Sequence, residues 1–130
     1  MACGGQNSAI TVASDYEMSL KLSLQCNFYA VQEPVFLRRR HGSNLSSATY
    51  DKMFATFQVF ERFVNENLPL QDKYSEIIRR RRVDFHRKLY REARREKQRE
   101  KMLLHSRQAF KLQKNLKTFW QMLAARCLLF

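Results

Sequence analysis

Residues 70–130 contain neither glycine nor proline, and this absence constrains the fold more than any other feature of the chain. Most residues in this stretch are Arg, Lys, Glu, Gln or Leu, which favour helices. Glycine and proline are the usual signals for the end of a helix. The C-terminal half is therefore predicted to form one or two long helices, at about 71–104 and 107–128, with a break near His105–Ser106.

A further helix is predicted before Pro69, where aromatic and apolar residues recur at steps of three and four. This spacing places them on one face of a helix; they are Tyr50, Met53, Phe54, Phe57, Phe60, Phe63 and Val64. Ser47 can cap the helix, which is expected over about 47–66. We favour core packing for the aromatic stripe, because aromatics that stack on bases usually lie exposed on sheets.

The part of the chain before this helix is predicted to be less regular. Residues 1–17 are small and polar and are expected to form a flexible N-terminus. Residues 18–46 are assigned to a short β segment and a basic loop, because Ser19–Tyr29 alternates apolar and polar side chains as strands do. The segment would pair locally with Val31–Leu37 or add to the sheet of a partner. The fold class expected from these patterns is mainly α.

Positive charge is concentrated on one predicted helix. The chain has 24 basic and 12 acidic residues, a formal net charge of +12, and residues 77–101 supply most of the excess. A local positive field attracts phosphate backbones, anionic lipid surfaces or acidic proteins. The glutamates after residue 91 can form i,i+3 pairs such as Glu92–Arg95, so that part is also explained as a solvated helical spacer.

Four consecutive arginines, Arg79–Arg82, are harder to explain as a spacer. Asp84 is the one nearby acid that we expect to pair with them, and a phosphate-rich partner would relieve their mutual repulsion. We predict non-enzymatic binding to RNA or DNA phosphates within a nucleoprotein assembly, with no base-reading set. The predicted contacts are Arg79, Arg80, Arg81, Arg82, Arg87, Lys88, Arg91, Arg94 and Arg95.

The rival hypothesis is a helical (coiled-coil) scaffold or cytoskeleton-associated adaptor that bridges protein partners. Its partner-binding residues would be Phe85, Leu89, Leu103, Phe110, Leu116, Trp120 and Leu123. Residues 110–130 are amphipathic, and we expect them to pack back on the Phe54–Phe63 stripe. Docking in a partner's groove or on a membrane surface, with Trp120 at the interface, are the alternatives.

Leu89-Tyr90-Arg91 resembles the tripeptide of the LYR-motif family, small helical mitochondrial proteins that act in complex assembly and iron–sulfur delivery. In that family the motif lies near the N-terminus, at the start of a three-helix bundle. The resemblance covers these three residues and a basic helical context, so no function is assigned from it.

Catalytic and metal chemistry are not expected. His41, His86 and His105 share no ligand spacing with cysteines or acids, and the three glycines form no phosphate-binding loop. We therefore predict no catalytic residue, no metal and no cofactor.

The location expected for the chain is intracellular, and the nucleus rather than the cytoplasm. The first residues lack the features of a secretory signal, and the three separated cysteines suggest free thiols. Arg79–Arg82 followed by Arg87-Lys88 resembles a nuclear localisation signal. No apolar run reaches the roughly 20 residues needed to cross a bilayer, so a membrane partner is not expected.

Overall fold

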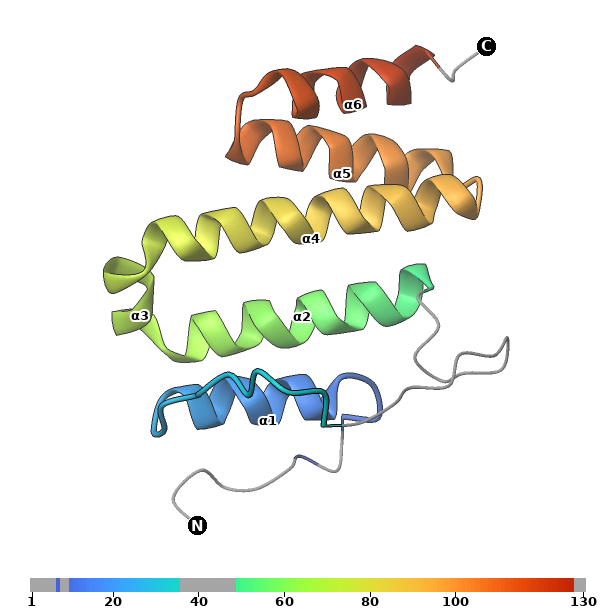
Figure 1. The fold of residues 1–130 in the computed structure, drawn as a ribbon. Coiled ribbons are helices and arrows are strands. Elements are labelled where there is room, and N and C mark those ends of the chain that lie inside the picture. The colour runs from blue at the N-terminus through green and yellow to red at the C-terminus, as the bar shows by residue number, and fades with distance from the viewer. Residues whose placement is uncertain (1–6, 8–9, 36–48, 128–130) are drawn as a thin grey trace.

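The computed structural model describes residue 7, residues 10–35 and residues 49–127. This part of the chain is mainly helical, as predicted. Its helices are α1 (Ser14–Ser23), α2 (Tyr50–Glu66), α3 (Leu68–Lys73), α4 (Ser75–Arg95), α5 (Arg99–Leu112) and α6 (Leu116–Cys127). Figure 1 shows α1, α2, α4, α5 and α6 side by side in that order, and each packs against the next. The predicted basic loop lies outside the described residues.

The aromatic stripe of α2 forms part of the core, as its spacing predicted. Phe57 and Phe60 pack against Phe85 of α4, with ring centroids 5.4 and 5.5 Å apart. The helix begins after Thr49, whose hydroxyl accepts a hydrogen bond from the amide of Lys52 at 3.4 Å. The helix ends at Glu66, and Pro69 stands in the first turn of α3, where its missing N–H costs no helical hydrogen bond.

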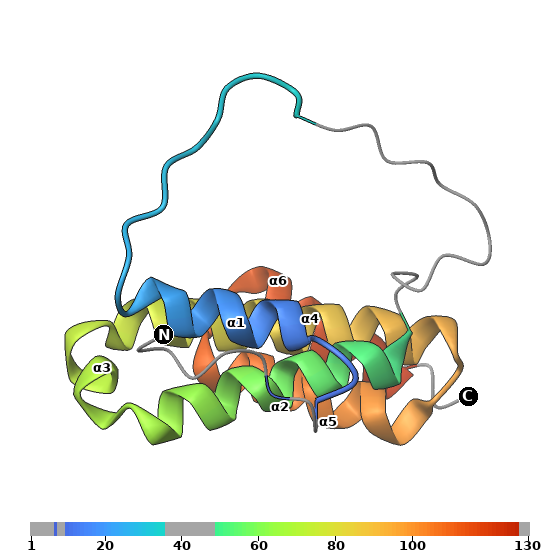
Figure 2. The same cartoon turned by 90° about the horizontal axis from the view of Figure 1, so that it is seen from below.

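The predicted β segment is wrong. Ser14–Ser23 is helical, and none of the described residues forms a strand. A strand needs a neighbour for its backbone hydrogen bonds, whereas a helix supplies its own. The helix is also held from outside, because Glu17 is buried and accepts a hydrogen bond from Arg62 of α2 at 3.2 Å. Residues 24–35 then leave the helices as an extended, exposed arch (Figure 2).

The break in the long basic helix lies nine residues before the predicted position. The chain turns at Glu96–Gln98, where Lys97 has a left-handed φ of 55°. The amide of Gln98 donates to the carbonyl of Ala93 at 2.8 Å and that of Lys97 to Arg94 at 3.2 Å, which is a Schellman C-cap. Such caps favour glycine, and a lysine at this position leaves no obvious signal in the sequence. His105 and Ser106, the predicted break, are buried in the middle of α5.

The C-terminal helix packs against α5. The prediction that it packs on the Phe54–Phe63 stripe is wrong. The chain turns again at Gln113–Asn115, so that Phe110 belongs to α5 and meets Phe119 of α6 at a centroid distance of 6.0 Å. Asn115 caps α6 by accepting a hydrogen bond from the amide of Thr118 at 2.9 Å. The place beside α2 is taken by α4, which follows α2 in the chain after the short helix α3.

The centre of the molecule is the contact of α2 with α4 and α5. Leu89 is fully buried there, together with Tyr50, Tyr90, Ala93, Met102 and Ala125. Among the described helices, none has the length and apolar character that a membrane span requires.

Candidate functional site

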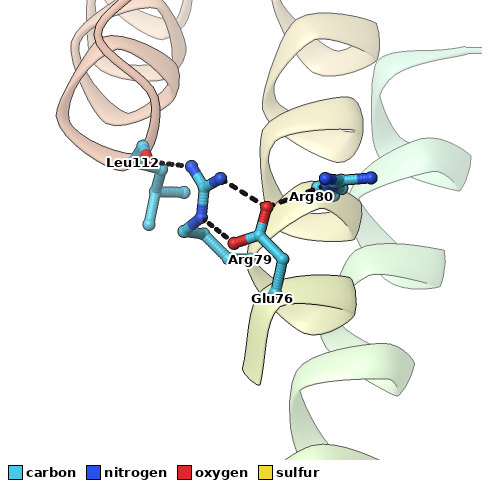
Figure 3. A network of polar contacts seen from close by, with 4 residues as sticks. All are labelled: Glu76, Arg79, Arg80 and Leu112. Atoms are coloured by element: carbon cyan, nitrogen blue, oxygen red, sulfur yellow. Dashed lines mark hydrogen bonds and ion pairs between the residues drawn. The ribbon is translucent and has the colours of Figure 1, made fainter. Parts of the chain in front are cut away.

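The arginine tetrad, Arg79–Arg82, is the first part of the predicted phosphate-binding set. Arg79 donates from Nε and Nη2 to the two carboxylate oxygens of Glu76, both at 2.7 Å, and Arg80 donates from Nε at 2.8 Å (Figure 3). These hydrogen bonds lower the pKa of Glu76 to about 2, so the carboxylate stays charged at any physiological pH. One glutamate therefore pairs with two of the four arginines, and its single negative charge offsets one of their positive charges.

Arg79 also connects α4 to α5. Its Nη1 donates to the carbonyl of Leu112 at 2.7 Å, at the C-terminal end of α5 (Figure 3). The last carbonyls of a helix have no partner within the helix and attract cations. Arg79 thus serves as a cap for a neighbouring helix.

Arg81 and Arg82 contact the helices on the other side of α4. Arg82 forms a two-pronged ion pair with Glu61 of α2, with N–O distances of 2.7 and 2.9 Å. The guanidinium of Arg81 lies over the rings of Phe85 and Tyr16, 4.8 and 5.7 Å from their centroids. Each member of the tetrad therefore has a partner in the fold, and the expectation that Asp84 alone could pair with them is wrong.

The remaining predicted cations lie further along α4. Arg95 pairs with Glu92 at 3.0 Å, but Arg87, Lys88, Arg91 and Arg94 form no ion pair with any residue that the structure describes. Arg87, Lys88 and Arg91 line a cleft together with two residues of α6. This cleft has a volume of about 210 Å³ and is lined by Asp84, Arg87, Lys88, Arg91, Lys117 and Gln121.

Two residues that line this cleft each carry a buried polar atom that lacks a hydrogen-bond partner among the described residues. These atoms are Nε of Arg87, a donor, and Oε1 of Gln121, an acceptor. A buried polar group without a partner costs about 1–3 kcal/mol, so such groups are uncommon in folded proteins. The unpartnered donor of Arg87, together with the excess of positive charge in the cleft, suits an anionic acceptor, whereas Gln121 Oε1 requires a donor from the same ligand.

A second basic cavity lies at the turn between α4 and α5. It has a volume of about 370 Å³ and is lined by Arg94, Lys97, Arg99 and Met102. The predicted residue Arg94 thus has two further cations beside it: Lys97 from the turn that the sequence did not reveal, and Arg99 from the start of α5. Lys117 and Gln121 were also missed as site residues, because nothing in the sequence brings side chains of α6 to the same cleft as side chains of α4.

The residues predicted to bind protein partners fall into three groups by their exposure. Phe85 and Leu89 are buried in the core and serve the packing of α4. Leu103, Phe110 and Leu123 are half-buried, whereas Leu116 and Trp120 are 76% and 65% exposed on α6.

Two histidines and a tyrosine form a buried polar chain between α2, α4 and α5. His86 Nδ1 lies 3.1 Å from His105 Nδ1, and His105 Nε2 lies 2.9 Å from the hydroxyl of Tyr50. Neutral rings satisfy both contacts, because each histidine then has one donor and one acceptor nitrogen. Burial lowers the pKa of His86, and burial together with the charges of His86 and Lys101 lowers the pKa of His105 to about 4. Since all three side chains are buried, this chain acts as part of the core.

No three His, Cys, Asp or Glu side chains come together to hold a metal within the described ranges. The LYR-like tripeptide is divided by the fold, because Leu89 and Tyr90 are buried in the core while Arg91 is exposed beside the cleft. Comparison of the chain with protein-family models, curated proteins and solved structures found no match.

Proposed function

We propose that this protein binds the phosphate backbone of a nucleic acid through the unpaired cations of α4, as a non-enzymatic component of a nucleoprotein assembly. The observation that carries the proposal is the division of the basic residues into two classes. Arg79, Arg81 and Arg82 are used by the fold, whereas Arg87, Lys88, Arg91 and Arg94 have no acidic partner among the described residues.

Three of the four unpaired cations lie about one turn apart on a single helix, and Lys88 is adjacent to the first of them. Arg87, Arg91 and Arg94 follow one another at steps of four and three, which puts them along one side of α4. Lys97 and Arg99 continue the positive charge around the turn into α5. An extended row of this kind suits a linear polyanion, because each phosphate that it neutralises releases counterions.

A protein-bridging function is the second proposal, and a specific observation favours it. Trp120 and Leu116 are large apolar side chains that α6 leaves exposed. Trp is enriched at the centres of protein interfaces, where it contributes more to affinity than most residues. The two proposals are compatible in one protein, since the exposed apolar residues and the unpaired cations are different residues.

Binding to generic duplex DNA or RNA should weaken steeply with salt. If Arg87, Lys88, Arg91 and Arg94 each contact one phosphate of a duplex, log K against log salt should have a slope of about −3 to −4. Fluorescence anisotropy of a labelled duplex at several salt concentrations measures this slope. Absence of binding even at low salt would exclude the nucleic-acid proposal.

A further inference from the structure

The cleft between α4 and α6 has the composition of a site for a compact anion. α4 supplies Asp84, Arg87, Lys88 and Arg91, and α6 supplies Lys117 and Gln121. α5 packs against both helices, whereas α4 and α6 do not approach each other closely in the described part of the chain. The cleft is therefore built by the two helices that flank α5, and it exists only when the chain is folded.

The charge in the cleft exceeds what one internal backbone phosphate would neutralise. Four cations face a single carboxylate, and none of the four has an ion-pair partner among the described residues. An internal phosphodiester carries one negative charge. A phosphomonoester carries about −1.5 to −2 at neutral pH, with three acceptor oxygens, and matches the excess better.

The buried polar atoms of the cleft agree with this kind of ligand. Arg87 Nε needs an acceptor, and arginine binds phosphoryl oxygens with two N–H groups side by side. Gln121 Oε1 needs a donor, which the P–OH of a phosphomonoester monoanion or a ribose 2′-hydroxyl supplies. A phosphomonoester monoanion carries both kinds of atom in one group, whereas the dianion carries acceptors alone.

The size of the cleft favours an end of the strand over its interior. Its volume of about 210 Å³ lies below the roughly 300–1,000 Å³ of pockets that hold drug-sized ligands. An internal phosphate would bring a nucleoside to either side of the cleft, whereas a terminal phosphate brings one. We propose that the cleft between α4 and α6 binds the terminal phosphomonoester of a nucleic-acid strand. This inference rests on the proposed function, because the phosphate is taken to belong to a nucleic acid. It assigns Arg87, Lys88 and Arg91 to one terminal phosphate where a strand ends in the cleft, and to separate backbone phosphates where a strand runs past it.

The test compares two oligonucleotides of one sequence, with a 5′-phosphate or a 5′-hydroxyl, labelled at the opposite end. The full-length protein should bind the phosphorylated strand about tenfold more tightly, as expected for charge-assisted contacts to a group that the other strand lacks. A 3′-phosphorylated strand measures whether the preference extends to the other end. Inorganic phosphate should compete with the phosphorylated strand and reduce this preference.

Substitutions assign the preference to the cleft. Lys117→Gln and Arg87→Gln should abolish it, and Asp84→Asn should increase it because the one carboxylate is removed. Lys114→Gln is the matched control, since Lys114 is exposed in the turn before α6 and does not line the cleft. Lys117 is exposed as well, so its replacement leaves the fold intact, and circular dichroism of each variant checks this.

The possible failures are distinguishable. Equal, salt-dependent binding of both strands would overturn the terminal-phosphate site and leave the proposed function standing. A preference that survives Lys117→Gln would overturn the cleft as its location. If neither strand binds, but vesicles containing phosphatidic acid bind in a Lys117-dependent manner, both the strand-end site and the proposed function are wrong.

Discussion

Replacement of Leu89 by alanine is expected to lower the free energy of unfolding by about 2–5 kcal/mol. Leu89 is 0% exposed and packs with Tyr50, Tyr90, Ala93 and Met102 between α2, α4 and α5. Its removal leaves a cavity that three helices would have to close together, and rigid helices relax only in part. Urea unfolding followed by circular dichroism at 222 nm measures the change.

The result also decides whether Leu89 belongs to the core or to an interface. The matched control is Leu116→Ala, which removes the same atoms from a side chain that is 76% exposed. Its effect on stability should stay within about 0.5 kcal/mol. If Leu89→Ala were as mild as Leu116→Ala, the packing of α4 described above would be contradicted, and Leu89 would again be available to a partner.

The second large effect is a loss of stability in weak acid. Folding keeps His105 neutral, because burial and the nearby His86 and Lys101 lower its pKa from 6.5 to about 4. In the unfolded chain the same histidine takes up a proton near pH 6.5. The unfolded state thus binds more protons than the folded state between about pH 6.5 and pH 4, and acid favours unfolding in that window.

The size of the effect follows from the shift. Each pKa unit corresponds to 1.36 kcal/mol, so His105 alone accounts for a loss of about 3 kcal/mol as the pH falls from about 7 to about 4. Above pH 6.5 the contribution is complete and stability should no longer depend on this group. His86, whose pKa burial also lowers, adds to the loss in the same direction.

Comparison with His105→Gln isolates this contribution. Glutamine does not titrate but keeps a donor and an acceptor near the hydroxyl of Tyr50. The variant should be less stable than the native protein at pH 7.5, yet lose less stability on acidification to pH 4.5. Parallel stability curves for the two proteins would show that His105 is not kept neutral by the fold.

The helical class and the aromatic core of α2 could be predicted because both depend on local spacing. The Phe stripe repeats at helical intervals, and residues 70–130 lack any helix breaker. The turn at Glu96–Gln98 could not be found in this way. It depends on a lysine in a left-handed conformation, which the fold stabilises by bringing Met102 next to Leu89 and Ala93.

The ion pairs of the arginine tetrad differ in how far they could be predicted from the sequence. Glu76 stands three and four residues before Arg79 and Arg80, so helical spacing could have revealed that contact. Glu61 is on another helix, and its pairing with Arg82 required the packing of α2 on α4. The basic cleft depends on tertiary structure in the same way, because Lys117 reaches Arg87 and Arg91 only after two turns of the chain.

The central claim is that unpaired cations, and not the arginine tetrad, bind phosphate. The most direct test compares Arg91→Gln with Arg80→Gln, since both substitutions remove one positive charge from an exposed position of α4, and Arg80 already pairs with Glu76. We predict that Arg91→Gln weakens duplex binding and makes the salt slope less negative by about 0.9, the value for one phosphate contact. Arg80→Gln should change neither quantity beyond the error of the measurement. If Arg80→Gln reduces the slope as much as Arg91→Gln does, the division of the basic residues into structural and binding classes is wrong.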